Sequence, residues 1–414
     1  MTRESDWVVC QLGAREHYAI PRALHAMGCL DMLLTDAWVP PGSPLGMIRR
    51  NLRERHHPAI PGERVNGFTA GAIGFEAAAR LRGWQGWEGI LRRNDWFQQR
   101  VVDQLCSLNP GSAHLPPLGT SGKARRAIPT LFSFSYTARE PFRWAKRKGW
   151  KTVLGQIDGA LGEERHIAEV QQRHEAVAGA FRPAPPRYWE QWREECEMAD
   201  TILVNSEWSR SLLMREGIPS DKIETVPLAY SPPTESLGFV REYPAVFDRA
   251  RPLRVLFLGQ VSVRKGVMEL LEAARMLAGR PVEWWMVGPE VVSLPRALRE
   301  QGQVRWFGAV PRGKAAEFYR NADVFLFPTH SDGFGLTQLE AQAWKLPIIA
   351  SAHCGRVVQP GRNGLELDAV SAEAIAEAIE SCLEEPERLA GWSRQAVDLE
   401  AFSLDRLASR LSSL

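Results

Sequence analysis

Several common signatures are missing from the 414-residue sequence. Its six cysteines form no CxxC pair or other metal-ligand spacing, which favours buried, reduced thiols over a disulfide framework. The formal net charge is only +2, so bulk charge gives no reason to expect a nucleic-acid partner. No apolar run approaches the roughly 18 residues of a membrane-spanning helix, and the N-terminal run is too short for a signal peptide. These absences predict a cytoplasmic protein and leave peripheral contact with the inner face of the membrane open.

Three phosphate-related motifs are absent as well. The sequence contains neither GxxxxGK[ST] nor GxGxxG, which argues against P-loop and dinucleotide oxidoreductase chemistry. It also contains no Asp-x-Asp, so nothing suggests a metal ion that bridges phosphates, and neither a metal nor a cofactor is expected. Any anion site must therefore be local, built from loops and helix starts.

Short apolar runs alternate with stretches of helical period through both halves of the chain. This pattern is typical of βα units and parallel sheets, and the length suits two domains of about 200 residues each. The predicted fold class is therefore α/β with two Rossmann-like domains. Strands are predicted at 6–13, 31–36, 130–136, 151–158, 200–206 and 223–230, and in the second half at 253–260, 283–289, 304–310, 323–329, 347–353 and 363–368.

The proline-rich residues 231–252 are predicted to link an N-terminal domain, 1–230, to a C-terminal domain, 253–394. Residues 395–414 have helical spacing, and one place for that helix is the surface of the first domain. Residues 41–125 are crowded with Arg and Trp, which indicates a helical insertion. An amphipathic helix that covers the first domain is the favoured interpretation, with a membrane-interface or anion-binding role left open.

The segment DVFLFPTHSDGFGLTQLEAQAWKLPIIAS (323–351) predicts a strand, a glycine-bearing loop, a helix and a second strand. Ligands of open parallel sheets bind beyond the carboxyl ends of the strands, so this loop should face a cleft. Gly333 and Gly335 let the backbone approach a ligand closely, and the free N–H groups of Leu336 and Thr337 favour an anion. The segment therefore predicts a phosphate site.

Two carboxylates flank this loop. Glu340 follows on the helix, where it can accept hydrogen bonds from a ribose diol, each contributing about 1.5–3 kcal/mol. Asp332 precedes the helix and would meet the other end of the same ligand. Taken singly, each is as easily explained as a first-turn acid or a turn residue. Together they fit a nucleoside diphosphate linked to a hydroxyl-rich group.

A second βα loop carries positive charge. In LRVLFLGQVSVRKGVMELLEAARML (253–277), a predicted strand leads through Gly259 to Arg264, Lys265 and Gly266 at a helix start. The helix dipole disfavours cations at that end, so their presence indicates an anionic partner. A guanidinium fork and an ammonium group could together neutralise a pair of phosphates.

These features resemble the nucleotide-sugar domain of the family 4, group 1 type glycosyltransferases. The similarity runs from about 253 to 394, and GRNGL at 361–365 and WMVGP add to it. QLGAREHYAIPRALHAMG in the first half is similar more loosely. The resemblance implies a GT-B fold, with two parallel sheets facing across a cleft. It also implies transfer of a sugar from a UDP- or GDP-linked donor to an acceptor hydroxyl, with retention of configuration, as in polysaccharide or glycolipid synthesis.

The resemblance also implies residue roles. Asp332 would contact the donor sugar, Glu340 the ribose and Lys265 the phosphates, with Arg264 substituting for a second phosphate-binding arginine where this chain has Gln260. Gly13 and Ala14 would form the small-residue loop that faces the donor diphosphate. The other implied donor-binding positions are Gly259, Gly288, Val310, Gly333, Phe334, Gly335, Leu336 and Thr337. The catalytic candidates are Asp332, Lys265 and Arg264, joined by Asp158 at the end of a predicted strand and by His17 at a predicted helix start. For Asp158 and His17 a capping or supporting role is the simpler explanation.

Two departures and two rival functions complete the sequence-based picture. Asp332 stands where glutamate is common and is shorter by one methylene, about 1.5 Å. Lys345 stands where a glycine often ends the helix. A nucleotide-sugar epimerase could share the architecture, as could a non-catalytic nucleotide-binding scaffold, although Lys265 and Glu340 argue against the scaffold. The acceptor could be a saccharide, a lipid-linked molecule or another small molecule.

Overall fold

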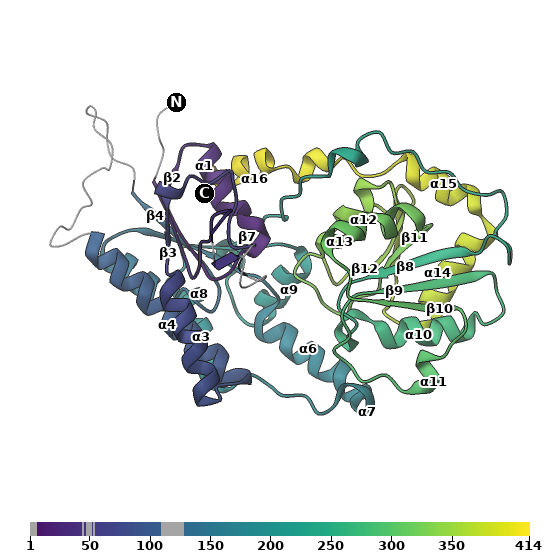
Figure 1. Ribbon diagram of the computed structural model, residues 1–414, viewed down its shortest axis with the longest axis horizontal. Coiled ribbons are helices and arrows are strands. Elements are labelled where there is room, and N and C mark those ends of the chain that lie inside the picture. Colours follow the sequence, from purple (N-terminus) through teal and green to yellow (C-terminus); the bar gives the residue numbers. More distant parts are fainter. Residues whose placement is uncertain (1–5, 44, 47–51, 53, 109–127) are drawn as a thin grey trace.

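The computed structural model describes residues 6–43, 45–46, 52, 54–108 and 128–414. Within them the chain forms two parallel sheets, which lie in separate halves of the molecule (Figure 1). The first sheet has the strand order β3-β2-β1-β4-β5-β6-β7 and the second has the order β10-β9-β8-β11-β12-β13. The α/β class with two Rossmann-like parallel sheets is therefore confirmed.

All seven strands of the first sheet run parallel, and its central strands are apolar and buried on both faces. They are β1 (Trp7–Gln11), β2 (Leu30–Thr35), β3 (Val65–Gly67), β4 (Thr130–Phe134), β5 (Lys151–Gly155), β6 (Thr201–Val204) and β7 (Ile223–Thr225). One face carries α4 (Gly86–Leu108), α5 (Arg139–Arg147), α8 (Pro186–Met198) and α9 (Glu207–Arg215), and the other carries α1 (Ala19–Ala26). Both sets of helices pack apolar side chains onto the sheet.

The second sheet has the same layered plan. Its strands are β8 (Leu253–Leu258), β9 (Val282–Val287), β10 (Val304–Gly308), β11 (Val324–Phe327), β12 (Ile348–Ser351) and β13 (Gly364–Leu367). The helices α10 (Val267–Met276), α14 (Ala372–Glu384) and α15 (Pro386–Arg394) cover one face, and α12 (Arg312–Asn321) and α13 (Leu336–Ala343) cover the other. The carboxyl ends of β8 and β11 therefore lead into the two loops singled out in the sequence.

All twelve predicted strands are present, although most are shorter than expected. The clearest shortening is at 223–230, where β7 ends at Thr225. After Val226 the chain leaves the sheet edge, and Pro227 cannot donate a backbone hydrogen bond to a neighbouring strand. Apolar residues therefore continue beyond the end of the strand, which is why the pattern overstated its length.

The region 41–125 differs from expectation in one respect. Its described part contains α3 (Thr69–Arg82) and α4, which form a helical hairpin, but it also contains β3, which pairs with β2 as the edge strand. We predicted no strand there, because three residues that include a glycine show no period. Residues 44, 47–51, 53 and 109–125 of this region lie outside the described part of the chain.

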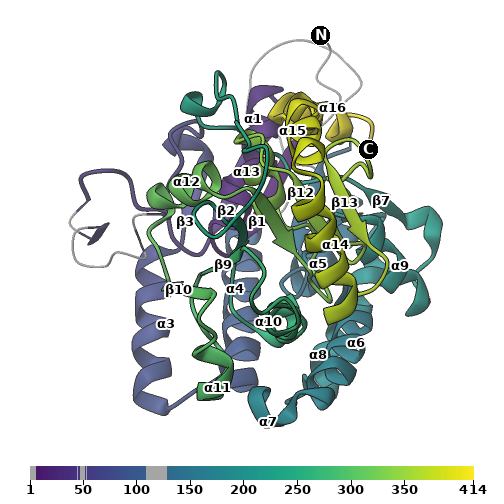
Figure 2. The same ribbon diagram turned by 90° about the vertical axis from the view of Figure 1, so that its right-hand side faces the viewer.

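Two chain segments cross between the sheets. In the first, Phe239 packs edge-on against Trp344 and Arg241 donates to the Trp344 carbonyl at 2.9 Å, which ties residues 231–252 to the second sheet's helices. In the second, the 3₁₀ turn η7 (Leu399–Phe402) contacts α13, and α16 (Leu404–Leu411) then packs on α1 of the first half (Figure 2). The end of the chain thus returns to the N-terminal sheet.

Cysteine burial is only partly as expected. Cys10, Cys196, Cys354 and Cys382 are buried and free, but Cys29 is half-buried and Cys106 is exposed. Cys106 lies on α4 away from the buried face formed by Phe97, Val101 and Leu105, so the expectation of six buried thiols was wrong for this residue. Among the described residues, no helix is both long enough and apolar enough to cross a bilayer.

Candidate functional site

The loop between β11 and α13 turns at a residue that has to be glycine. Gly335 has φ +84°, and a Cβ atom there would lie 2.6 Å from the Phe327 ring. The backbone can therefore reach the start of α13 only if this position lacks a side chain. At that start the Thr337 hydroxyl is buried and has no hydrogen-bond partner among the described residues. An orphan hydroxyl beside free helix N–H groups suits an anionic oxygen from a ligand.

Lys265 and Asp332 meet at this loop. The buried Lys265 ammonium forms an ion pair with Asp332 Oδ2, while Asp332 Oδ1 accepts the N–H of Phe334 at 3.2 Å. Burial alone would raise the pKa of Asp332, but the charge and hydrogen bond of Lys265 hold it below its usual value. The carboxylate is therefore ionised, and the pair places one cation and one anion beside α13.

Arg264 contacts both the same loop and the other domain. Its Nη1 donates to the Ser331 carbonyl at 2.7 Å and lies 3.8 Å from Glu163 Oε1 on α6 (Ala160–Arg173). Arg264 and Lys265 occupy the 3₁₀ turn η6 (Val263–Lys265), and α10 begins only after Gly266. They therefore lie directly before the N-cap of α10 and not within the helix, so both cations stand at its N-terminal end, beyond the carboxyl end of β8.

The two domains touch around this loop. A Cβ atom on Gly333 would lie 2.5 Å from the Ile157 carbonyl oxygen, so the loop is pressed against the segment after β5. Trp208 of α9 donates its indole N–H to Ser331 Oγ at 2.8 Å and stacks on His353, with ring centroids 4.1 Å apart. The structure is thus a closed arrangement in which side chains of both domains surround the loop.

Glu340 lies one turn into α13, on the side away from the buried face. Its Oε2 accepts a hydrogen bond from the Tyr319 hydroxyl at 2.8 Å. Tyr319 is itself buried on α12, so it fixes the position of the carboxylate. Glu340 is therefore held in place on the same helix whose start carries the orphan Thr337 hydroxyl.

The remaining predicted positions of the C-terminal half fall into two groups. Gly259 and Gly288 face each other at the ends of β8 and β9, since a Cβ atom on Gly288 would lie 1.8 Å from the Gly259 carbonyl oxygen. Val310 follows β10 and is partly exposed. Phe334 is buried against Phe402 with ring centroids 6.0 Å apart, so only its backbone could meet a ligand.

Gly13 and Ala14 follow β1 in the N-terminal half. The Gly13 N–H donates to Asp36 Oδ1 at 2.8 Å, and Asp36 also accepts Arg55 Nη1 at 3.0 Å. Gly13 has φ +88°, and a Cβ atom on it would lie 3.2 Å from Arg55 Nη1. The loop therefore packs on an arginine–carboxylate ion pair that no sequence pattern had indicated.

His17 was expected at a helix start, but the chain turns the other way there. Glu16, His17 and Tyr18 have φ values of 51°, 50° and 60°, a left-handed turn that side chains rarely adopt. α1 begins only at Ala19, and His17 is exposed. The prediction of a helix start at His17 was therefore wrong by two residues, and its side chain does not join the Lys265 cluster.

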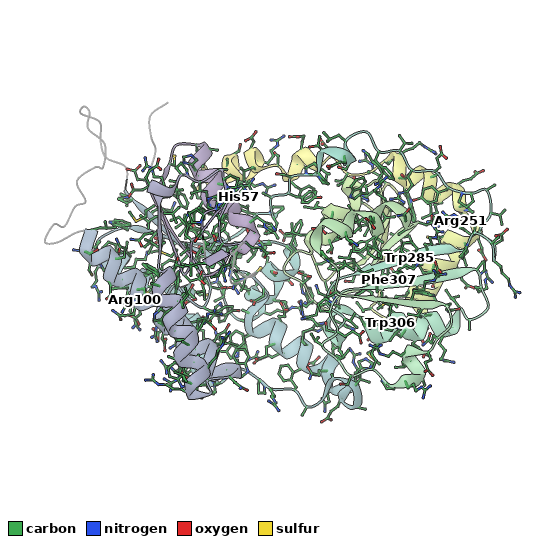
Figure 3. The ribbon with its side chains drawn as sticks, viewed as in Figure 1. His57, Arg100, Arg251, Trp285, Trp306 and Phe307 are labelled. Carbon is green, nitrogen blue, oxygen red and sulfur yellow. The ribbon has the colours of Figure 1, made fainter. Side chains whose placement is uncertain are left out.

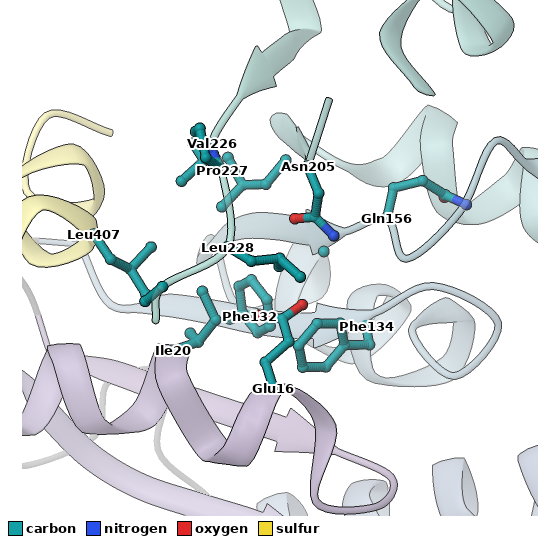
Figure 4. Close-up of a pocket in the computed structure, with 13 residues that line it drawn as sticks. Glu16, Ile20, Phe132, Phe134, Gln156, Asn205, Val226, Pro227, Leu228 and Leu407 are labelled. Carbon is teal, nitrogen blue, oxygen red and sulfur yellow. The ribbon is translucent and has the colours of Figure 1, made fainter. Parts of the chain in front are cut away.

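Glu16 points into a cavity of about 20 Å³, room for about one water molecule (Figure 4). The walls are largely apolar, with Ile20, Phe134 and Leu228 around the carboxyl group. Burial raises the pKa of Glu16 to about 7, against an opposing effect of Arg15. A carboxyl group that titrates near neutrality thus lies beside the β1 loop.

Asp158 lies between β5 and α6 and is held within its own domain. Its Oδ1 accepts the Tyr136 hydroxyl at 2.6 Å, Gln156 Nε2 at 2.8 Å and the Ala160 N–H at 3.0 Å. These three donors make it an anchor of the β5–α6 turn. Since that turn presses on Gly333, Asp158 shapes the wall opposite the loop.

The structure therefore brings Lys265, Arg264 and Asp332 together, with Glu340 on the adjoining helix. The contacts that close the site come from residues we did not single out: Glu163, Trp208, His353 and Ser331. No sequence motif marks them, because each meets its partner across the domain boundary. Asp36 did carry a signal, since it ends a predicted strand of a parallel sheet. In the part of the chain that the structure describes, no three His, Cys, Asp or Glu side chains are grouped to hold a metal ion.

Comparisons with known proteins identify the family. The model of the family "Glycosyl transferases group 1" matches residues 243–398. The D-inositol 3-phosphate glycosyltransferase of Rhodococcus jostii is 30% identical over 434 aligned residues, which cover 96% of this chain and 91% of that protein. The O-antigen chain mannosyltransferase B of Escherichia coli is 28% identical over 246 residues, 54% of this chain and 62% of that protein.

Solved structures with two facing Rossmann-like domains are similar over nearly the whole chain. The sucrose-phosphate synthase of Thermosynechococcus elongatus has a TM-score of 0.67 at 16% identity, covering 99% of this chain and 98% of that one. Anabaena HepE in complex with UDP-glucose has a TM-score of 0.60 at 13% identity, covering 99% and 100%. At such identities the likeness shows the fold alone, and that fold is GT-B.

The fold and the loops at its cleft define a GT-B enzyme. The chain belongs to the group 1 glycosyltransferases. Its activity is the transfer of a hexose-type sugar from a nucleotide sugar. The epimerase and scaffold alternatives raised by the sequence are therefore disfavoured.

Proposed function

We propose that a nucleoside diphosphate sugar binds between the domains, with its diphosphate at Lys265, Arg264 and the start of α13. The observation that carries this proposal is the buried Lys265 ammonium, which is paired with Asp332 on the loop that leads into α13, the helix whose first turn carries the orphan Thr337 hydroxyl. Glu340 then faces the ribose and Asp332 the sugar.

The chemistry of transfer follows from this placement. The acceptor oxygen bonds to the anomeric carbon, and the bond from that carbon to the diphosphate breaks with its electron pair staying on the diphosphate. The acceptor hydroxyl gives up its proton to the departing diphosphate. Lys265, Arg264 and the helix N–H groups stabilise the negative charge that develops there, which is the effect that usually dominates such a barrier. The contacts across Gly333 and Trp208 exclude water.

Substitutions at the two carboxylates test the assignment of the ligand's two ends. Glu340→Ala should weaken binding of free UDP or GDP by about tenfold or more, because ribose loses its acceptor. Asp332→Ala should leave that binding nearly intact, since Lys265 becomes fully available to the phosphates, but should reduce sugar transfer. Calorimetric titration measures the first and release of nucleoside diphosphate the second.

The exposed Glu317 on α12 supplies the control, because Glu317→Ala removes a carboxylate without touching the site. The reverse pattern for Glu340 and Asp332 would contradict the assignment of the two ends. Failure of the wild-type protein to bind any nucleoside diphosphate or its sugar conjugate would overturn the proposed donor site. Comparing UDP with GDP in the same titration identifies the base.

The finer features that the resemblance implies belong to the same proposal. We assign the chain to family 4 with retention of anomeric configuration, which the NMR coupling constant of the product's anomeric proton tests. Transfer should not need a metal ion, so chelation with EDTA should leave the rate unchanged. The role we propose is cell-surface polysaccharide or glycolipid synthesis at the cytoplasmic face of the membrane.

The tip of the α3–α4 hairpin supports the membrane part of this proposal. Leu81 is 88% exposed and Ile90 42% exposed, and both lie among the arginines Arg82 and Arg92. Exposed apolar side chains with arginines next to them are typical of a contact with an anionic lipid surface. Sedimentation with phosphatidylglycerol vesicles, lost in Leu81→Ser, is the expected result, and equal sedimentation of both proteins would contradict it.

A further inference from the structure

A second cavity, of about 490 Å³, lies between the carboxyl end of β2 and the α3–α4 hairpin. None of the residues predicted to bind the donor lines it. The charged residues of its wall are Asp36, Arg55, Glu76, Arg80 and Arg93. It is large enough for a ligand of several non-hydrogen atoms, and its lining is dominated by charge.

The charges in this cavity are unequal. Arg55 pairs with Asp36, and Arg93 of α4 pairs with Glu76 of α3. Arg80 lines the cavity but forms no ion pair with any described residue, so one positive charge remains uncompensated. The described bonds of Arg55 and Arg93 to these acids each use one guanidinium nitrogen, which leaves further N–H donors for a ligand.

The paired acids also hold the arginines in place. The Asp36 side chain is only 5% exposed, so Arg55 is anchored to a fixed carboxylate at the end of β2. Arg93 and Glu76 join the two helices of the hairpin, which fixes the distance between Arg80 on α3 and Arg93 on α4. Arg55 and Arg93 are thus preorganised guanidinium forks, which recognise phosphate or carboxylate oxygens in a bidentate manner, while Arg80 is exposed and free to turn towards the same anion.

The cavity also borders the proposed transfer site. Asp36 accepts the Gly13 N–H, and Arg55 Nη1 lies 3.2 Å from the place of a Gly13 Cβ atom. Gly13 is the residue proposed to face the donor diphosphate. A ligand that fills the cavity would therefore have one end at Gly13, beside the donor, and its other end at the hairpin arginines.

We propose that this cavity is the acceptor site and that the acceptor carries an anionic group, such as a phosphate, in addition to the hydroxyl that receives the sugar. Arg80 and Arg93 bind the anion, and the Asp36–Arg55 pair orients the hydroxyl end towards Gly13. This inference rests on the proposed donor site. The anion can belong to a soluble phosphorylated polyol or to a lipid headgroup, because both present the same phosphate oxygens.

The test is a titration of the full-length chain, with UDP or GDP present, against glycerol 3-phosphate and against glycerol. Glycerol 3-phosphate should bind and glycerol should not. Arg80→Gln and Arg93→Gln should each weaken glycerol 3-phosphate binding by about tenfold or more, because a charge-assisted hydrogen bond is lost. Arg80 has no described ion pair, so its loss should not disturb folding.

Arg100→Gln is the matched control, because Arg100 is an exposed arginine on the same helix (Figure 3), two turns beyond Arg93, and does not line the cavity. It should bind glycerol 3-phosphate as the wild type does. Nucleotide binding should stay unchanged in all three variants, so a failure of nucleotide binding in the wild type would overturn the donor site, and a failure confined to glycerol 3-phosphate would overturn only this inference.

Vesicles that contain phosphatidic acid distinguish the two sources of phosphate. Vesicle binding that is weakened by Arg80→Gln but not by Arg100→Gln assigns the cavity to a lipid-borne acceptor. Glycerol 3-phosphate binding without such vesicle binding assigns it to a soluble acceptor. Equal binding of glycerol 3-phosphate and glycerol, no binding of either at millimolar concentrations, or equal loss in all three variants would overturn the inference.

Discussion

In the C-terminal domain the loops at the cleft turn on glycines, whereas in the N-terminal domain they turn mainly on residues that carry side chains. Gly266, Gly288 and Gly335 all have positive φ, and a Cβ atom on any of them would clash with the backbone or a ring. The loop after β1 contains one glycine with positive φ, Gly13, whose Cβ would meet only the Arg55 side chain, and makes the rest of its left-handed turn with Glu16 and its two successors. The C-terminal side of the cleft is therefore shaped mainly by backbone, and the N-terminal side mainly by side chains.

This difference matches the two kinds of ligand that a transferase must hold. A diphosphate can be held by backbone N–H groups and a fixed cation, which need close approach and therefore glycine. An acceptor is distinguished by its own charge and hydroxyl pattern, which only side chains can match. Substitutions should therefore have larger and more general effects on the C-terminal side than on the N-terminal side.

The largest effect is expected for Lys265→Ala. The substitution removes the cation at the diphosphate and leaves the half-buried Asp332 without its partner, so kcat/KM should fall by about a hundredfold or more for every acceptor. Steady-state kinetics measure this effect. Lys314→Ala on the exposed surface of α12 should leave kcat/KM unchanged. If Lys265→Ala lowered kcat/KM by only a few-fold, Lys265 could not be the central cation of the proposed donor site.

An intermediate effect is expected for Gly335→Ala. A methyl group would meet the Phe327 ring at 2.6 Å in a backbone conformation that alanine disfavours. The free energy of unfolding should fall by about 2–4 kcal/mol. Gly302→Ala is the comparison, because open space surrounds Gly302, and it should change stability by less than about 0.5 kcal/mol. Urea denaturation of both variants gives the difference, and equal stabilities would show that the loop can relax.

The smallest effect is a pH dependence on the N-terminal side. The pKa of Glu16 is raised in the folded protein, from 4.5 to about 7, so the folded state binds more protons between these values than the unfolded state. Stability linked to this group is therefore complete below pH 4.5 and is lost as the pH rises to about 7. Denaturation at pH 5 and pH 8 should show wild type losing more stability than Glu16→Gln, whereas parallel losses would mean that Glu16 titrates normally.

The same contrast explains what the sequence could predict. Twelve strands and the two C-terminal loops were predictable because apolar period and glycine are local signals. Strand β3 was not predictable, because three residues at a sheet edge are too few to show an alternation of apolar and polar residues. The left-handed turn at His17 was not, because its residue types favour a helix and only the packing of the folded domain holds them in that conformation. The contacts of Glu163 and Trp208 were not predictable either, because their partners lie in the other domain and no local sequence pattern indicates such a contact.

The two chain crossings have a consequence for how the domains move. The Tyr230 N–H donates to the Phe402 carbonyl at 2.8 Å, so the outgoing and returning segments are bonded to each other where they pass between the domains. Two adjacent connections on one edge restrict the domains to rotation about that edge, whereas a single linker would allow rotation in any direction. The cleft should therefore open by rotation about that edge. The largest separation is expected on the opposite side, where α6 contacts η6.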